Sequence, residues 1–100
     1  MHGHSYRLEV AIRGPLQTQG PASGMVEDFE TIEAIVEQRV VHRLDHQTLN
    51  DLIENPTAEN VLLWIWQQLD GHLQGFEEAV LWETPRACVV LRRGNLHLSS

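Results

Sequence analysis

Polar and apolar residues alternate near the start of the chain. The apolar positions are Tyr6, Leu8, Val10 and Ile12, and the positions between them are Arg7, Glu9, Ala11 and Arg13. A period of two is typical of a strand that buries one face. The pattern therefore predicts a half-buried β-strand over residues 5–13. A loop with several Gly and Pro residues is predicted to follow, over residues 14–24.

Two later segments change to the helical period. In residues 28–43 the apolar positions follow helical spacing, and they are Ile32, Ile35, Val36 and Val40. Asp28 at the start of this predicted helix is a candidate N-cap. Residues 44–56 are predicted to be a polar connection. A second helix is predicted to begin after Thr57, its N-cap, and to end near residues 70–71. The residues expected to form its buried stripe are Val61, Leu62, Ile65 and Leu69. Trp64 and Trp66 cannot both lie on that stripe.

The last third of the chain returns to strand-like patterns. Residues 79–83 and 87–92 are rich in β-forming residues, and residues 84–86 between them predict a hairpin. The predicted order is strand, helix, helix, strand, strand. Two helices grouped between strands favour an α+β fold, in which both helices cover one face of an antiparallel sheet of three strands.

Composition narrows the class of protein. One hundred residues predict a single domain spanning 1–100. The 14 Asp and Glu outnumber the 7 Arg, there is no Lys, and the net charge of −7 argues against nucleic acid or an anionic membrane as main partner. The single cysteine, Cys88, excludes an intramolecular disulfide and is expected to be a buried inert thiol. No apolar run is long enough to span a bilayer, and we expect a cytoplasmic protein.

The most distinctive candidate for chemistry is the pair His2 and His4 around Gly3. In an extended strand, residues i and i+2 point to one face, roughly 6–7 Å apart. Two imidazoles placed in this way can both reach one metal ion, although a catalytic zinc site typically has three protein ligands. The alternative is that both are solvated side chains at a chain end.

Two further candidates contain carboxylates. Asp45 beside His46 can set the tautomer or the basicity of the imidazole if the two side chains meet; otherwise both belong to a polar loop. Glu83 falls on the same predicted strand face as Leu81, where a carboxylate needs a partner. That partner is either a ligand with a pair of N–H donors or an Arg of the chain, unless Glu83 is simply exposed near the strand end.

Five motifs resemble one family when taken together, and they span nearly the whole chain. They are His-Gly-His-Ser-Tyr (2–6), Gly-Met-Val-Glu-Asp-Phe (24–29), Leu-Asp-His-Gln-Thr-Leu-Asn (44–50), Pro-Thr-Ala-Glu-Asn-Val (56–61) and Trp-Glu-Thr-Pro (82–85). In this order they resemble the 6-pyruvoyltetrahydropterin synthase family. The resemblance is greatest to its bacterial 6-carboxytetrahydropterin synthase branch, which serves queuosine biosynthesis.

The resemblance implies a tunnelling fold, or T-fold, assembled as trimers and hexamers with active sites between subunits. It implies a lyase that acts on 7,8-dihydroneopterin triphosphate, eliminates triphosphate and, in the queuosine branch, releases acetaldehyde. Position by position, it implies zinc ligands at His2 and His4, proton transfer by Asp45 and His46, and pterin anchoring by Glu83 and Thr57. Ala58 stands where some relatives have a second hydroxyl.

The chain also departs from the family pattern. The family's first strand, with a third zinc ligand and a catalytic cysteine, precedes the His-Gly-His motif, and here the sequence begins at Met1. Cys88 does not match that cysteine. Three hypotheses follow: an enzyme of the carboxy-forming or the pyruvoyl-forming branch, a truncated non-catalytic member that keeps the fold, or a small interaction domain in which His-Gly-His is incidental.

Overall fold

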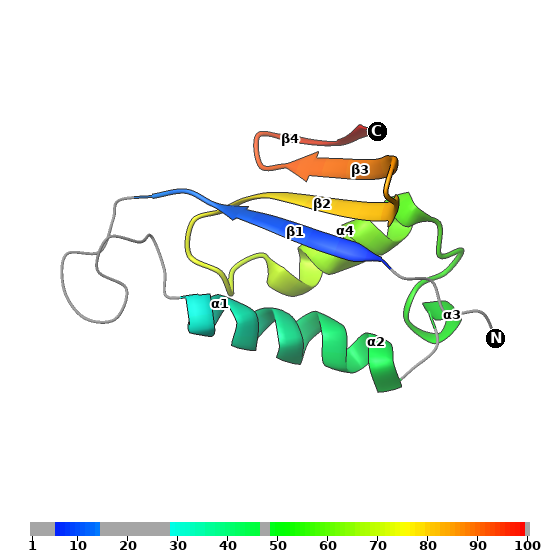
Figure 1. Cartoon of the computed structure of the whole chain (residues 1–100), viewed down its shortest axis with the longest axis horizontal. Helices are drawn as coiled ribbons and strands as arrows, with labels where there is room; N and C mark the ends of the chain where they lie inside the picture. The colour runs from blue at the N-terminus through cyan, green and yellow to red at the C-terminus, as the bar shows by residue number, and fades with distance from the viewer. Residues whose placement is uncertain (1–5, 15–28, 47–48, 100) are drawn as a thin grey trace.

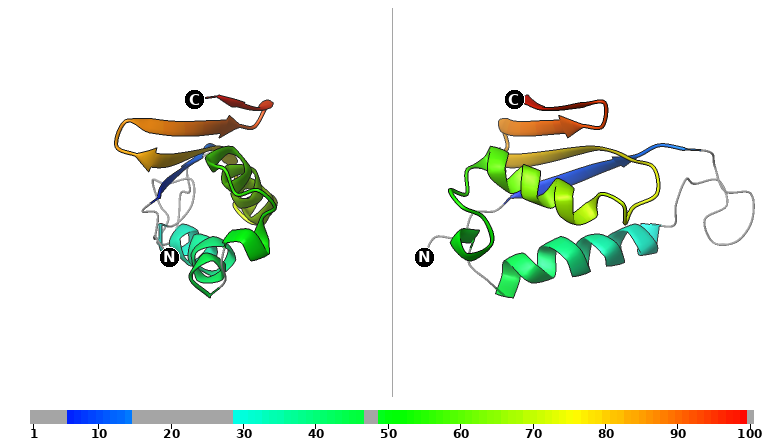
Figure 2. Two further views of the ribbon diagram at one scale, coloured as in Figure 1. Left: turned by 90° about the vertical axis from the view of Figure 1, so that its right-hand side faces the viewer. Right: turned by 180° about the vertical axis from the view of Figure 1, so that it is seen from behind.

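The computed structural model describes residues 6–14, 29–46 and 49–99. Four antiparallel strands form one sheet in the order β1-β2-β3-β4, and the helices lie on one of its faces (Figures 1 and 2). The strands are β1 (Arg7–Ile12), β2 (Phe76–Thr84), β3 (Ala87–Arg92) and β4 (Asn95–Ser99). This two-layer α+β arrangement is the predicted class, and it is consistent with the T-fold.

The sheet has one strand more than the sequence predicted. β1 lies within the predicted 5–13 strand, and the β2–β3 hairpin turns at the predicted place. β4 was missed because Asn95–Ser99 alternates polar and apolar residues over only five positions. It pairs antiparallel with β3 after a turn at Gly94, which has a φ of 80°. The extra strand widens the sheet on the side away from β1.

The first predicted helix is observed as a continuous helical stretch with an irregular centre. It comprises α1 (Phe29–Val36), the π-helical segment η1 (Glu37–Val41) and α2 (His42–His46). The N–H of His42 donates to the carbonyl of Glu37, a five-residue step. None of the residues of α1, all of which the structure describes, is fully buried, whereas Val40 of η1 is. The proposed cap Asp28 lies outside the described residues.

The second predicted helix is α4 (Ala58–Leu69), and it provides six of the fourteen buried hydrophobic residues found among the described residues. Its predicted stripe is buried against β2 and β3, where Phe76, Ala79, Leu81, Val89 and Leu91 are buried in turn. The two tryptophans divide as the sequence required. Trp66 is buried against Phe76, with 4.4 Å between ring centroids, and Trp64 is half-buried beneath the guanidinium of Arg43.

The predicted polar connection over residues 44–56 is partly wrong. The end of α2 and a short helix, α3 (Leu49–Leu52), occupy much of it, and Ile53 is buried in the core. Burial of this one apolar residue ties the connection to the rest of the protein. A five-residue or four-residue helix has too few repeats to produce a recognisable period in the sequence.

Candidate functional site

Most candidate residues that the structure describes come to one end of the molecule. β1 and β2 are antiparallel, so the start of β1 lies beside the end of β2. The end of α2 and the start of α4 lie at that same end, to the right in Figure 1 and to the left in the reverse view of Figure 2. The fold therefore brings Glu83, Thr57 and the segment Asp45–His46 to one end of the molecule from three separate parts of the sequence.

Glu83 lies one residue before the end of β2, at an irregularity in its pairing with β3. Trp82 pairs with Cys88 and Thr84 with Ala87, so the ladder passes over Glu83. Such irregularities re-aim a side chain and are frequent near active sites. The Glu83 side chain is exposed, and within the described part of the chain it forms no hydrogen bond or ion pair. Its carboxylate can accept donors from a ligand.

Tyr6 lies next to this carboxylate on the helix-facing side of the sheet. The register pairs Arg7 with Trp82 and Leu8 with Leu81, which places Tyr6 across from Glu83. Burial raises the pKa of the Tyr6 phenol above its ordinary value, and the negative charge of Glu83 raises the pKa further. The sequence analysis did not single out Tyr6 as a site residue, although it is part of the His-Gly-His-Ser-Tyr motif.

On the opposite face of the same two strands, a small cluster of side chains joins β1 to β2. The indole Nε1 of Trp82 donates to Glu9 Oε1 at 2.6 Å. The Arg7 guanidinium lies 5.0 Å from the Trp82 ring centroid and donates to the same carboxylate at 3.2 Å. Since Trp82 precedes Glu83 directly, these contacts hold the end of β2 in place. The sequence showed Arg7 and Glu9 as the positions between the apolar residues of a strand and Trp82 as part of the Trp-Glu-Thr-Pro motif, but it did not predict that they meet.

Thr57 is the N-cap of α4, as predicted. Its backbone is extended, with φ of −69° and ψ of 165°, and its Oγ1 accepts the N–H of Asn60 at 3.2 Å. The Asn60 side chain donates in turn to the carbonyl of Asn55 at 2.8 Å, which ties the preceding loop to the first turn. A threonine hydroxyl that accepts one hydrogen bond can still donate its own hydrogen. The exposed Thr57 can therefore cap the helix and contact a ligand.

The other four predicted site residues lie wholly or partly outside the described residues. Asp45 and His46 are the last residues of α2, but their side chains are outside what the structure describes. His2 and His4 lie outside the described residues altogether. Among the described residues, no three His, Cys, Asp or Glu side chains are grouped to hold a metal ion. The described helices are also all too short or too polar to cross a membrane.

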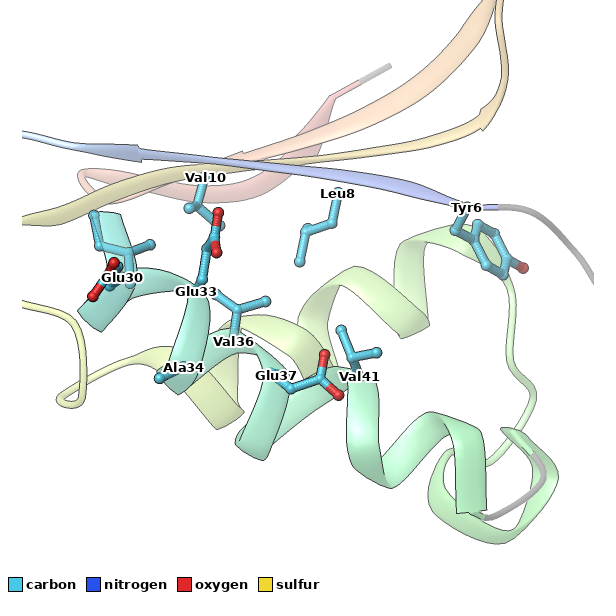
Figure 3. Close-up of a pocket in the computed structure, with 10 residues that line it drawn as sticks. Tyr6, Leu8, Val10, Glu30, Glu33, Ala34, Val36, Glu37 and Val41 are labelled. Carbon is cyan, nitrogen blue, oxygen red and sulfur yellow. The ribbon is translucent and has the colours of Figure 1, made fainter. Parts of the chain in front are cut away.

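A groove of about 760 Å³ lies between β1 and the α1–η1 helix. Figure 3 shows Tyr6, Leu8 and Val10 projecting from β1 toward the helix, whose side of the groove includes Glu33 and Glu37. Tyr6, at one end of the groove, lies across from Glu83, and none of the predicted site residues that the structure describes lines the groove. Among the described strands β1 stands at the edge of the sheet, and its apolar side chains Leu8 and Val10 on the helix side are only partly buried.

Comparison with known proteins gives a consistent result. The sequence profile of the family described as 6-pyruvoyl tetrahydropterin synthase matches residues 1–94. A dihydroneopterin monophosphate aldolase of Pyrococcus furiosus is 37% identical over 83% of this chain and 70% of its own length. A 6-carboxy-5,6,7,8-tetrahydropterin synthase of Synechocystis is 40% identical, over 70% of this chain and 57% of its own length.

More distant relatives agree with this assignment. A 6-pyruvoyl tetrahydrobiopterin synthase of Drosophila melanogaster is 30% identical over 91% of this chain. The matches span 57% of the length of the Drosophila and Synechocystis proteins, so the chain corresponds to little more than half of each. A profile match over nearly all residues, together with these identities, leads to one conclusion: the chain belongs to the 6-pyruvoyl tetrahydropterin synthase family.

Proposed function

We propose that residues 1–100 form one pterin synthase-like domain of a 6-carboxy-5,6,7,8-tetrahydropterin synthase, a lyase that acts on 7,8-dihydroneopterin triphosphate in queuosine biosynthesis. The observation that supports this most is the position of Glu83. It is an exposed carboxylate without a protein partner among the described residues, at the end of the fold where Thr57 and the end of α2 also lie. The family match supplies the class of substrate.

Glu83 is proposed to recognise the pterin ring. The ring's 2-amino group and adjacent ring N–H form a pair of parallel donors, and a carboxylate accepts such a pair through both oxygens. Charge-assisted hydrogen bonds of this kind are stronger than neutral ones. The hydroxyl of Thr57 is proposed to donate to the same ligand while it continues to accept the N–H of Asn60.

Asp45 and His46 are proposed to transfer protons on the substrate side chain. A carboxylate beside an imidazole can hold its tautomer and adjust its basicity, which is what a general acid–base pair requires. Their position at the end of α2 is the backbone observation that supports this role. His2 and His4 are proposed as zinc ligands by family resemblance, and zinc would polarise the substrate hydroxyls.

An oligomer is part of the proposal. Family members are expected to place active sites between subunits, and the partly buried apolar side chains of the β1–α1 groove leave surface for a neighbour to cover. We therefore propose a homotrimer or hexamer in the cytoplasm. The zinc content of the purified protein tests the proposed metal site, and one zinc per chain is expected. The mass of the protein in solution tests the proposed oligomer.

Two alternatives have specific support. The Pyrococcus relative matches over more of this chain than the Synechocystis relative does, which favours an aldolase acting on a dihydroneopterin phosphate. The eukaryotic relatives favour the pyruvoyl-forming reaction, and 6-pyruvoyltetrahydropterin would be the product. A third possibility, a non-catalytic member that retains pterin binding, predicts ligand binding without turnover.

Product analysis separates these alternatives. The purified protein is incubated with 7,8-dihydroneopterin triphosphate and, separately, with the monophosphate, and products are identified by mass spectrometry. We expect 6-carboxytetrahydropterin and acetaldehyde from the triphosphate. Glu83→Gln should weaken binding of the pterin at least about tenfold, because one charged acceptor pair is lost. Glu54→Gln, an exposed residue with the same change in charge, is the control. Unchanged pterin binding by Glu83→Gln would refute the proposed role of Glu83.

A further inference from the structure

A second cavity, of about 450 Å³, lies at the end of the sheet away from Glu83. Three arginines line it, Arg13, Arg92 and Arg93, together with Glu77 and Glu78. These are three of the seven arginines in a chain of net charge −7. A concentration of guanidinium groups in one cavity of an acidic protein suggests an anion as ligand, because guanidinium donors match phosphate and carboxylate oxygens.

The backbone brings the three arginines together at neighbouring strand ends. Arg13 directly follows β1, and its N–H donates to the carbonyl of Gly75 at 2.7 Å, just before β2 begins. Arg93 directly follows β3, and its N–H donates to the carbonyl of Glu77 at 2.7 Å. The pairing of β1 with β2 is irregular between Ala11 and Ile12, which adds twist at this corner. The cavity is therefore built on hydrogen-bonded backbone.

Carboxylates and a backbone carbonyl orient the guanidinium groups of Arg92 and Arg93, and each guanidinium keeps N–H donors that can bind a ligand. Arg92 uses its Nε to bond Glu78. Arg93 donates from Nε to the carbonyl of Phe76 at 2.8 Å and from Nη2 to Asp70 at 2.6 Å. Among the described residues, both terminal nitrogens of Arg92 and the Nη1 of Arg93 have no other hydrogen bond.

Arg13 differs from the other two arginines. Its side chain is exposed, and within residues 6–14, 29–46 and 49–99 it forms no hydrogen bond or ion pair. Asp70, Glu77 and Glu78 stand against the three arginines, so the charges balance in number, but among the described residues the guanidinium of Arg13 is unpaired. An anion that enters between Arg13 and the two oriented arginines gains charge-assisted hydrogen bonds without breaking an existing ion pair.

We propose that this cavity binds a phosphate group of a phosphorylated small molecule, with Arg13 as the principal contact and with Arg92 and Arg93 as oriented secondary donors. The site is separate from the proposed pterin site of the same chain. Glu78 and Glu83 are five residues apart on β2, which is about 16 Å at the rise of a strand. The proposal does not depend on the pterin reaction.

The test is the affinity of inorganic triphosphate for the purified protein, measured by isothermal titration calorimetry at low salt. Arg13→Gln should weaken binding about tenfold, because a charged bidentate donor is lost. The matched control is Arg39→Gln, which removes an exposed arginine of η1 outside the cavity and should change affinity less than twofold. Glu83→Gln should also leave triphosphate affinity unchanged, which separates this site from the pterin site.

Three results would overturn the proposal. They are no binding of triphosphate at millimolar concentration, an equal loss of affinity in Arg39→Gln and Arg13→Gln, or equal affinity for sulfate and triphosphate. If Arg13→Gln does not yield folded protein, Arg92→Gln is the second variant. It removes only an exposed ion pair besides the proposed contact, and the expected loss of triphosphate affinity is smaller than that of Arg13→Gln but greater than that of Arg39→Gln.

Discussion

Gly75 gives the sharpest test of the geometry that joins β1 to β2. Its φ is +75°, in the left-handed region, and a Cβ added there would lie 2.0 Å from the carbonyl oxygen of Arg13. Gly71 and Gly94 have similar φ values, +84° and +80°, but an added Cβ at either meets nothing within 4 Å. The three glycines therefore separate the cost of backbone conformation from the cost of a steric clash.

The magnitudes follow from that comparison. Alanine in the left-handed region costs about 1 kcal/mol, so Gly71→Ala and Gly94→Ala should each lower the free energy of unfolding by about that amount. Gly75→Ala carries the same cost, and it also forces the backbone of Arg13 away from the carbonyl that accepts its N–H at 2.7 Å. Loss of that bond and local displacement add about 1–3 kcal/mol.

The assay is urea unfolding of the three variants under identical conditions, with the midpoint and slope fitted for each. Gly75→Ala should be less stable than either control by about 1–3 kcal/mol, which corresponds to roughly 4–8 °C in Tm for each kcal/mol. If all three variants lose the same stability, the close approach of Gly75 to Arg13 is wrong, and so is the rigid corner on which the proposed phosphate site is built.

Three further predictions concern the two ends of the fold. Thr57→Ala should cost about 1 kcal/mol in thermal unfolding because the cap of α4 is lost, while Thr57→Ser keeps the hydroxyl and should be near wild type; equal losses would contradict the capping role. Arg93→Gln should be clearly more destabilising than Arg92→Gln in urea unfolding. Arg93 joins β3 to the C-terminal end of α4 and stacks over Trp66, whereas Arg92 has one exposed ion pair. Tyr6 is the single tyrosine of the chain, so tyrosinate absorbance reports it alone. The pKa of Tyr6 should lie above 10.0. The contribution of Tyr6 to stability is therefore full below pH 10.0 and is lost as the pH rises through the folded-state pKa. Removal of the Glu83 charge should lower the pKa of Tyr6. A pKa at the ordinary value in wild type would contradict the burial of Tyr6 beside Glu83.

Local patterns in the sequence predicted most elements of the fold. The alternation in residues 6–13, the helical stripe of α4 and the β2–β3 hairpin each depend on residues within one short window. The cap at Thr57 was predicted for the same reason, because a cap is formed by a residue and its neighbour three positions later. The sequence analysis did not predict β4 or the helices within residues 44–56, because these elements have too few repeats to establish a period.

The candidate site was predicted only as separate pieces. The sequence indicated that Glu83 has a chemical role, but not that it lies across from Tyr6 at an irregularity of the β2–β3 ladder. That arrangement depends on the register between strands whose residues are more than seventy positions apart. A one-residue change of register would turn either side chain to the other face of the sheet.

The amino-acid sequence by itself determined most of the longer strands and helices, which faces of them are apolar, and which family motifs are present. Only the tertiary structure decided that Glu83, Thr57 and the end of α2 share one end of the molecule while Arg13, Arg92 and Arg93 share the other. The physical reason is that periodicity and capping depend on near neighbours, whereas the meeting of distant side chains depends on how strands pair and on which residues the common core can bury.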